Sequence, residues 1–476
     1  MRTASSSSPM PVAALQHPGR AKPEAARPPV ARRALESWGR TSSAAYDTVS
    51  LFWRTDPLDI PAGQTVLPFG LGRSYGDSCL NEGGALLLTR GLDRFLAFDA
   101  ASGVLRCEAG VSLAEIVALV VPRGWFLPVT PGTKFVTLGG AIANDVHGKN
   151  HHRAGTLGRH VRRFELLRSD GTRLLCSPEE NADWYEATIG GLGLTGLITW
   201  AEVSLRPIAN PFMDAESVRF DALDEFFALN RESESRFEYT VAWIDALARG
   251  RSLGRGHYLR ANHATTPPAL PLPPATRRLA VPFDFPSGVL NRFTLRALNT
   301  IYYHRQRRKV RRSLVHFDRF FYPLDAVGSW HRVYGRRGFF QYQCVVPFAD
   351  GEMVMRELLG AVGHSRQASF LAVIKSFGQG RQPGWLSFPR PGFTLALDFP
   401  NRGARTLRLF DELDRIVVTA GGAVYPAKDA RMSAATFRCS FPDWQRLVPY
   451  VDPAFSSSFW RRVTSNAASG APHSAQ

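Results

Sequence analysis

The chain has 476 residues, of which 44% are hydrophobic and 21% charged. This length predicts two or three domains, and this composition is ordinary for a globular protein, so wholesale disorder and a fibrous fold are excluded. The net charge of +17 favours an anionic partner, namely nucleic acid, a phosphorylated substrate or an acidic membrane surface.

The N-terminal residues and the cysteines narrow the class of protein. Residues 1–33 carry six basic side chains but no apolar core of a signal peptide, which predicts a disordered tail. No stretch approaches about 18 consecutive apolar residues, so we expect no membrane-spanning helix. The five cysteines lie far apart without a Cys-x-x-Cys pair, and this spacing predicts neither a disulfide framework nor a zinc site.

Short strands and helices alternate in the first half of the chain. Strands are predicted at 65–69, 85–88, 95–99, 104–108 and 196–205, with a hairpin of 164–167 and 172–175. Ser112 and Glu115 have the spacing of a capping box, which predicts a helix that ends before Gly124.

After Pro207 the predicted elements become longer. Strands are expected at 338–347 and 393–398, and the apolar spacing of 404–420 predicts an amphipathic helix. These elements indicate a second domain with a broad sheet. The proline-rich segment 265–286 and the basic segment 304–312 are both expected to be mobile loops.

Glycine is concentrated in the first half, where 21 of the 41 glycines lie between Gly63 and Gly196. The motif 191–196 matches G-x-G-x-x-G, but a predicted helix precedes it and a predicted strand follows it. Because this order is the reverse of a Rossmann unit, we disfavour that interpretation. Loop N–H groups that form nests can hold phosphates instead, with Ser74, Thr133 and Asn144 as additional donors. Three glycine clusters without a Walker lysine favour an extended dinucleotide such as FAD.

Lysine is rare, with six residues against 52 arginines. Codon bias explains this ratio, but so does retention of lysine where a compact ammonium group is needed. Composition leaves both explanations open.

Several motifs resemble a known flavoenzyme family. They are Leu71-Gly-Arg-Ser-Tyr-Gly-Asp77, Thr130-Pro-Gly-Thr133, the run from Gly139 to His152, Gly190–Gly196, Lys375-Ser-Phe-Gly378 and the run from Tyr425 to Arg431. They are similar to the vanillyl-alcohol-oxidase superfamily and, within it, to the decaprenylphosphoryl-β-D-ribose 2-oxidase branch. The likeness covers about residues 34–465. Four of the six lysines, Lys134, Lys149, Lys375 and Lys428, fall inside such motifs, which weakens the codon-bias explanation.

The resemblance implies an α+β fold. It places a PCMH-type FAD-binding domain of two α+β subdomains at 34–207. A substrate-binding domain with a broad antiparallel sheet flanked by helices would follow at 208–421. The C-terminal segment 422–476 would then return to the FAD domain.

The resemblance also implies a set of flavin contacts. They are Gly72, Arg73, Ser74, Tyr75, Gly76, Gly132, Thr133, Gly139, Gly140, Asn144, His147, Gly148, Ala154, Ile198 and Tyr425. Many members bind flavin covalently through a histidine where this chain has Tyr75, and some add a cysteine near Thr133. Neither nucleophile is present here, so we expect non-covalent FAD.

For the substrate, the resemblance implies contacts from Gln341, Gln343, Lys375, Thr394, Ala396 and Lys428. Lys428, with His147 and Tyr75, would position and deprotonate the ribose 2-hydroxyl. The alternatives are a structural salt bridge for each lysine and a hydrogen-bonded loop histidine for His147. No metal is expected, because the nearby histidines lack a carboxylate cluster.

The chain departs from the family at three positions that bear on the substrate. Mycobacterial members have a cysteine at Ala396 and an asparagine at Thr394, and Phe321 replaces a tyrosine. These changes leave flavin chemistry in place and put the exact sugar and lipid in doubt.

The implied activity is that of an FAD-dependent oxidoreductase acting on CH–OH groups. A polyprenylphosphoryl-β-D-ribose would be oxidised to its 2-keto sugar, and an NAD(P)H-dependent short-chain reductase would complete the epimerisation to arabinose for the cell wall. Such a protein would lie in the cytoplasm or peripherally at the bacterial inner membrane. The alternative is an oxidase of a soluble sugar, polyol or aldonolactone. Nucleic-acid binding is disfavoured, since the arginines are scattered and no binding module is recognisable.

Overall fold

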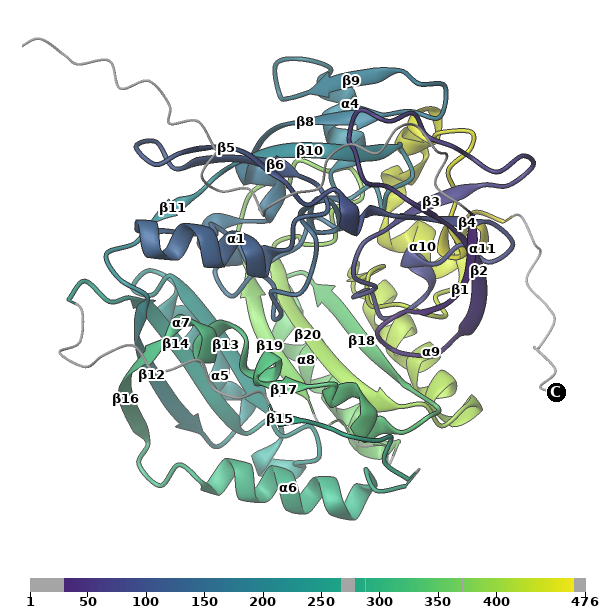
Figure 1. Ribbon diagram of the computed structural model, residues 1–476. Coiled ribbons are helices and arrows are strands. Elements are labelled where there is room, and N and C mark those ends of the chain that lie inside the picture. Colours follow the sequence, from purple (N-terminus) through teal and green to yellow (C-terminus); the bar gives the residue numbers. More distant parts are fainter. Residues whose placement is uncertain are drawn as a thin grey trace, which may run out of the picture.

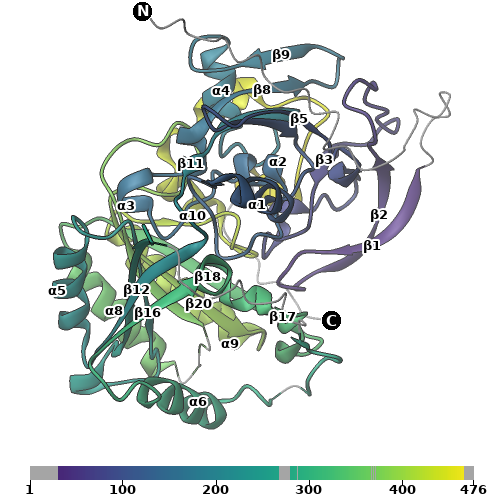
Figure 2. The same ribbon diagram turned by 60° about the vertical axis from the view of Figure 1, so that its left-hand side comes forward.

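The computed structural model describes residues 30–266, 279–286, 288–365, 367, 369 and 371–465. They form an α+β fold in which smaller sheets and short helices lie against one face of a broad sheet (Figures 1 and 2). This arrangement confirms the predicted fold class. None of the helices in these ranges has both the length and the apolar composition needed to cross a membrane.

Two sheets build the N-terminal unit. The first has the order β1-β2-β4-β3, and the second has the order β5-β6-β10-β8-β9. Their strands are β1 (Ala31–Glu36), β2 (Ser43–Ser50), β3 (Val66–Phe69), β4 (Ala85–Leu88), β5 (Phe95–Asp99), β6 (Val104–Glu108), β8 (Val161–Leu167), β9 (Arg173–Cys176) and β10 (Leu197–Ser204). The strands predicted between residues 65 and 205 are therefore all present. The unit also contains α1 (Leu113–Val120), α2 (Leu138–Ala143), α3 (His151–Ala154), α4 (Ala182–Thr188) and the short pair β7 (Trp125–Phe126) and β11 (Arg206–Pro207).

Helix α1 begins and ends where its sequence signals place it. The Glu115 backbone N–H donates to Ser112 Oγ at 3.2 Å, and the Glu115 carboxylate accepts from the Ser112 backbone N–H at 2.7 Å. This reciprocal pair satisfies two of the free N–H groups at the helix start. One 3₁₀ turn extends the helix as far as Gly124, whose φ of 79° lies in the left-handed region that glycine tolerates.

Residues 31–33, which we expected in a disordered tail, belong to a strand. Residues 1–29 lie outside the described residues, but Ala31 and Arg33 belong to β1, where they pair with Thr48 and Tyr46 of β2. The prediction of a tail to residue 33 is wrong at this end, because alternating residues of an arginine-rich strand can face solvent on one side of a sheet.

The broad sheet has eight strands in the order β16-β12-β14-β13-β19-β20-β18-β21, and all neighbouring pairs are antiparallel. The strands are β12 (Phe212–Phe220), β13 (Tyr239–Ile244), β14 (Gly256–His263), β16 (Val310–His316), β18 (Phe339–Val346), β19 (Ala372–Phe377), β20 (Gly392–Pro400) and β21 (Ala423–Val424). Helices α5 (Leu223–Ser233), α8 (Gly351–His364) and α9 (Ala404–Thr419) cover one face (Figure 2). The other face looks toward the N-terminal unit. The predicted antiparallel sheet flanked by helices is confirmed.

The basic segment 304–312 is a loop only at residues 305–309, and its two ends belong to regular elements. His304 ends α6 (Arg292–His304), and Val310 begins β16, which is the edge strand of the broad sheet. Arg312 Nε donates to Glu216 Oε1 of the neighbouring strand at 2.8 Å. Charged side chains are common on edge strands because they prevent pairing with other chains, so the basic residues 311 and 312 belong to an edge strand and not to the loop before it.

The other expected loop, 265–286, lies outside the described residues between 267 and 278. The short strand β15 (Leu279–Ala280) follows and pairs in parallel with β17 (Val327–Gly328). Between β16 and β17 the chain forms the short helix α7 (Phe317–Phe321).

The C-terminal segment first adds a strand to the broad sheet and then reaches the N-terminal unit. Strand β21 pairs with β18, so the chain is still in the broad sheet after residue 422. Helices α10 (Ala434–Ser440) and α11 (Ser458–Thr464) follow, and they lie beside the first sheet in yellow in Figure 1. Arg462 of α11 donates to Asp77 at 2.7 Å and to Asp429 at 2.9 Å, which joins three distant segments of the chain.

Candidate active site

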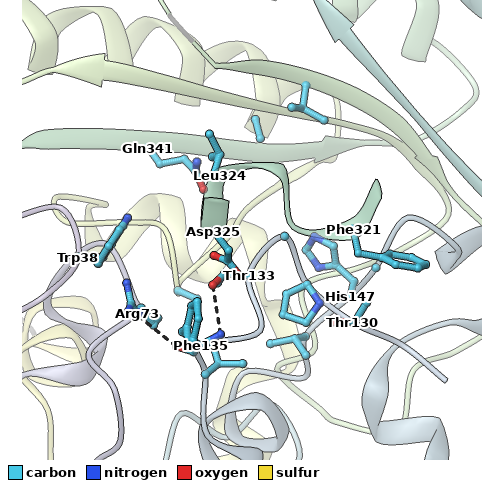
Figure 3. Close-up of a pocket in the computed structure, with 18 of the residues that line it drawn as sticks. Trp38, Arg73, Thr130, Thr133, Phe135, His147, Phe321, Leu324, Asp325 and Gln341 are labelled. Atoms are coloured by element: carbon cyan, nitrogen blue, oxygen red, sulfur yellow. Dashed lines mark hydrogen bonds between the residues drawn. The ribbon is translucent and has the colours of Figure 1, made fainter. Parts of the chain in front are cut away.

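A cavity of about 1150 Å³ lies between the glycine-rich loops of the N-terminal unit and the open face of the broad sheet. It is larger than the range of roughly 300–1,000 Å³ that is usual for small-molecule pockets. In Figure 3, Gln341 lies by the strands at the top of the view, and Arg73, Thr133 and Phe135 lie on the loops below it. The cavity therefore has room for a dinucleotide and a second molecule.

Glycines bring the loop backbone to the cavity wall. A Cβ at Gly132 would meet no protein atom within 4 Å, so this backbone borders open space that a ligand can fill. A Cβ at Gly139 would lie 2.9 Å from the Ala109 side chain, so glycine is needed there for close packing. Glycine is also needed for close packing at Gly76, where a Cβ would lie 1.9 Å from the carbonyl oxygen of Asp429 in the C-terminal segment.

Arg73 is fixed at the edge of the cavity by two contacts. Its Nε donates to the carbonyl oxygen of Phe135 at 3.1 Å, and its guanidinium carbon lies 4.0 Å from the ring centroid of Trp38. The Phe135 backbone N–H donates in turn to Thr133 Oγ1 at 3.2 Å (Figure 3). These contacts order the loop that carries Gly132 and Thr133.

The predicted substrate residues lie on one face of the sheet because strand residues alternate between faces. Gln341 and Gln343 are on β18, Lys375 is on β19, and Thr394 and Ala396 are on β20. The register places Gln343 opposite Ala396 and Lys375 opposite Thr394. All five side chains line the cavity.

His147 is held in one tautomer by the sheet. The Gln343 side-chain amide lies 3.0 Å from His147 Nε2 and 3.3 Å from Thr394 Oγ1. Because an amide NH₂ only donates, Nε2 must accept, and the ring proton lies on Nδ1. Burial, with a smaller effect from the nearby Lys375, holds the pKa of His147 well below its usual 6.5. The imidazole is therefore neutral at pH 7.

Lys428 lies beside Tyr75 and close to a buried carboxylate. The Tyr75 backbone N–H donates to Ala427 O at 2.9 Å, and the Lys428 ammonium lies 4.0 Å from the Tyr75 ring centroid. Gln341 donates to Oδ1 of the fully buried Asp398, whose Oδ2 has no partner among the described residues. Burial lowers the pKa of Lys428, and the charge of Asp398 partly opposes this effect. Lys428 can thus release and accept a proton near neutral pH.

Tyr75 stays protonated. Burial raises the pKa of its phenol well above 10, and the charge of Asp398 adds to this effect. The three predicted catalytic side chains all line the cavity, but Tyr75 contributes a ring face and a neutral hydroxyl, not a base.

Most of the predicted site residues line the cavity. Those that do so are Gly72, Arg73, Ser74, Tyr75, Gly132, Thr133, Gly139, Gly140, Asn144, His147, Gly148, Ile198, Gln341, Gln343, Lys375, Thr394, Ala396, Tyr425 and Lys428. Gly76 and Ala154 are not in its wall. Gly76 packs against the C-terminal segment, and the Ala154 carbonyl lies 3.0 Å from His160 Nε2.

The structure also adds residues that the sequence did not single out. Asp398 is two positions after Ala396 on β20, and this spacing alone would have placed it on the same face. Trp38 had no role assigned from the sequence and lies in the cavity wall, and Asp325 reaches the cavity from the segment after α7.

The cavity residues fit a flavin dinucleotide. Asn144 Oδ1 is buried without a partner among the described residues, so it can accept a hydrogen bond from the flavin. Loop N–H groups and Arg73 supply donors for anionic oxygens on the same wall.

Comparison with known proteins gives a consistent result. A family model described as an FAD binding domain matches residues 61–177. Decaprenylphosphoryl-β-D-ribose oxidase of Mycolicibacterium smegmatis is 37% identical over 458 residues, which cover 91% of this chain and 98% of that protein. An uncharacterized protein of Streptomyces coelicolor is 37% identical over 370 residues, 74% of this chain and 100% of that protein.

A shorter part of the chain is similar to Delta(24)-sterol reductase of Rattus norvegicus, which is 31% identical over 24% of this chain and 22% of that protein. The nearly full-length match to the mycobacterial oxidase is the one that defines the family. The chain belongs to the decaprenylphosphoryl-β-D-ribose oxidase family of FAD-dependent oxidoreductases.

Proposed function

We propose that this protein oxidises the 2-hydroxyl of a polyprenylphosphoryl-β-D-ribose to the 2-keto sugar, as the first half of epimerisation to the arabinose form. The observation that carries this proposal is a buried lysine, Lys428, with a lowered pKa on the wall of a cavity that fits a flavin. The printed name of the mycobacterial relative supports the choice of sugar.

Different residues of the chain have separate roles in this reaction. FAD held by the loops with Arg73, Gly132 and Thr133 would supply the acceptor for the hydride that leaves the carbinol carbon. The neutral Nζ of Lys428 accepts the hydroxyl proton, and the Asp398 carboxylate stabilises the ammonium that forms. His147 donates through Nδ1 to a sugar oxygen, while Gln343 holds its other nitrogen.

The apolar part of the cavity favours a lipid-linked sugar over a soluble polyol. Val241, Leu259 and Val373 line its far wall, beyond the polar residues near Lys428. A water-soluble sugar would leave this wall without contacts. A 2-keto product of this kind needs a second hydride transfer to become the arabinose epimer, and we assign that step to an NAD(P)H-dependent short-chain reductase as partner.

We also propose that FAD is bound without a covalent link. Cys79 and His147 are nucleophilic side chains in the described cavity wall. Burial raises the pKa of Cys79 to about 12, so its sulfur stays a thiol, and Nε2 of His147 is engaged by Gln343.

Acid precipitation of the purified protein should release all of the FAD into the supernatant, because no bond holds it once the fold is lost. The visible spectrum of supernatant and pellet measures this. A yellow pellet would contradict non-covalent binding.

A membrane-facing surface is proposed at α6. This helix buries Leu295, Asn299 and Tyr303 but leaves Phe293 81% and Ile301 67% exposed on its opposite side. An apolar solvent face of this kind marks an interaction surface. The basic segment 304–312 directly follows it and suits anionic lipid, where each basic residue contributes about 1 kcal/mol.

The double variant Phe293→Glu/Ile301→Glu should pellet with anionic liposomes much less than the parent, because it places negative charge on this face. Met353→Glu is the matched control, since Met353 is 64% exposed on α8, on the opposite face of the broad sheet. Equal recovery of parent and double variant in the supernatant would remove the proposal.

Lys428→Met should lower kcat by about 10²- to 10⁴-fold, the usual contribution of a general base, while the protein keeps its flavin. Flavin content and turnover of a short-chain prenylphosphoryl ribose measure this, with Arg231→Met at an exposed position on α5 as control. Turnover of Lys428→Met at the parent rate would refute the assigned role.

Asp398→Asn should move the acidic limb of the kcat/KM profile to lower pH. Lys428 acts when it is deprotonated, so the rate rises with pH through its pKa. The Asp398 charge raises that pKa, and its removal must therefore lower it. An acidic limb at unchanged or higher pH would contradict the effect of Asp398 on the pKa of Lys428.

A further inference from the structure

Two further lysines line the cavity, and the mechanism above does not use them. Lys149 Nζ donates to Phe321 O at 2.9 Å, and Lys375 Nζ donates to Gly148 O at 2.6 Å. An ammonium group has three donors, so each lysine keeps two that these bonds do not use.

Neither lysine has an ion-pair partner among the described residues. By contrast, Lys134 pairs with Asp318, and Lys309 pairs with Glu225 at 2.5 Å. The carboxylate of Asp325 acts on Lys149 only from beyond ion-pair distance. The cavity thus holds more positive than negative charge.

Without a ligand, burial and mutual repulsion destabilise the charged forms of Lys149 and Lys375. Burial, together with the smaller effect of the charges of Lys149 and Lys428, lowers the pKa of Lys375 to about 7. Burial likewise lowers the pKa of Lys149 to about 8. An anion between these ammonium groups would relieve the repulsion and use their free donors.

An apolar row begins next to Lys375. Strand register places Gln343 opposite Ala396, Ala396 opposite Val373, and Val373 opposite Trp243. At about 4.8 Å between neighbouring strands, the apolar members of this row, Ala396, Val373 and Trp243, span roughly 10 Å of the sheet. All four side chains line the cavity, and the Trp243 ring lies 4.5 Å from that of Tyr302 on α6.

We propose that Lys149 and Lys375 bind the phosphodiester of the substrate, and that the row Ala396–Val373–Trp243 holds the first isoprene units. The rest of the prenyl chain then leaves the cavity toward α6. The identity of the sugar rests on the proposed function, but the binding of a phosphate joined to an alkyl chain does not.

The order of groups along the cavity matches the order in such a substrate. Lys428 and His147 lie at the sugar end, Lys375 lies next to them, and the apolar row follows two residues away on β19. This placement also explains why lysine was kept in a chain of 52 arginines, since a compact ammonium fits a confined phosphate.

The test is binding of geranyl methyl phosphate, a diester with no sugar to oxidise, to the FAD-loaded protein by calorimetry. Lys149→Gln and Lys375→Gln should each raise its Kd by about tenfold or more, since each removes a charge-assisted hydrogen bond. The uncharged geranyl methyl ether should bind the parent and both variants equally. Arg231→Gln, at an exposed position on α5 away from the cavity, is the control for net charge.

A second arm tests the apolar row and separates lipid-linked from free phosphate. In the parent, affinity should rise from inorganic phosphate to methyl phosphate and then to geranyl methyl phosphate. Val373→Thr should reduce the gain in affinity that the geranyl group gives. The proposal is overturned if the lysine variants bind the diester as tightly as the parent does, or if their affinity for the ether falls as much as their affinity for the diester. It is also overturned if the length of the alkyl chain has no effect on affinity. Because no turnover is measured, this result is independent of whether the ribose is oxidised.

Discussion

The unequal burial of charge between the glycine-rich loops and the broad sheet is the constraint on which the site depends. Three lysines and one carboxylate share a desolvated space, and desolvation is the largest influence on each of their pKa values. This environment makes Lys428 a base near neutral pH, keeps His147 neutral, and leaves Lys149 and Lys375 with unused donors. Exposed to water, the same side chains would carry ordinary charges and have no such reactivity.

The broad sheet makes this arrangement possible because its two faces have different partners. Tyr342 points to α9, where its hydroxyl donates to Asp414 at 3.0 Å, while Gln341 and Gln343 on either side of it point to the cavity. Alternation along each strand thus gives a core on one face and a binding wall on the other. Strand register then sets which polar side chains meet, as with Gln341 and Asp398.

Local signals in the sequence predicted the elements well, and long-range pairing explains what they missed. The capping box at Ser112 and the strand of residues 85–88 depend on neighbours in the chain, and both are as expected. The spacing of Asp398 from Ala396 indicates its face of the sheet, but its hydrogen-bond partner Gln341 is 57 residues away, so no local pattern could reveal that contact. The loop predicted at 304–312 is present only at 305–309, because charge on the edge strand that begins at Val310 resembles charge in a loop.

The most direct measurement of the central claim uses a prenylphosphoryl ribose that carries deuterium at C2 of the sugar. Anaerobic single turnover with the FAD-loaded protein should bleach the flavin more slowly than with the unlabelled substrate. Mass spectrometry should then show a keto sugar that has lost the deuterium. Retention of the deuterium in every product, or bleaching at an unchanged rate with oxidation at another carbon, would contradict the account.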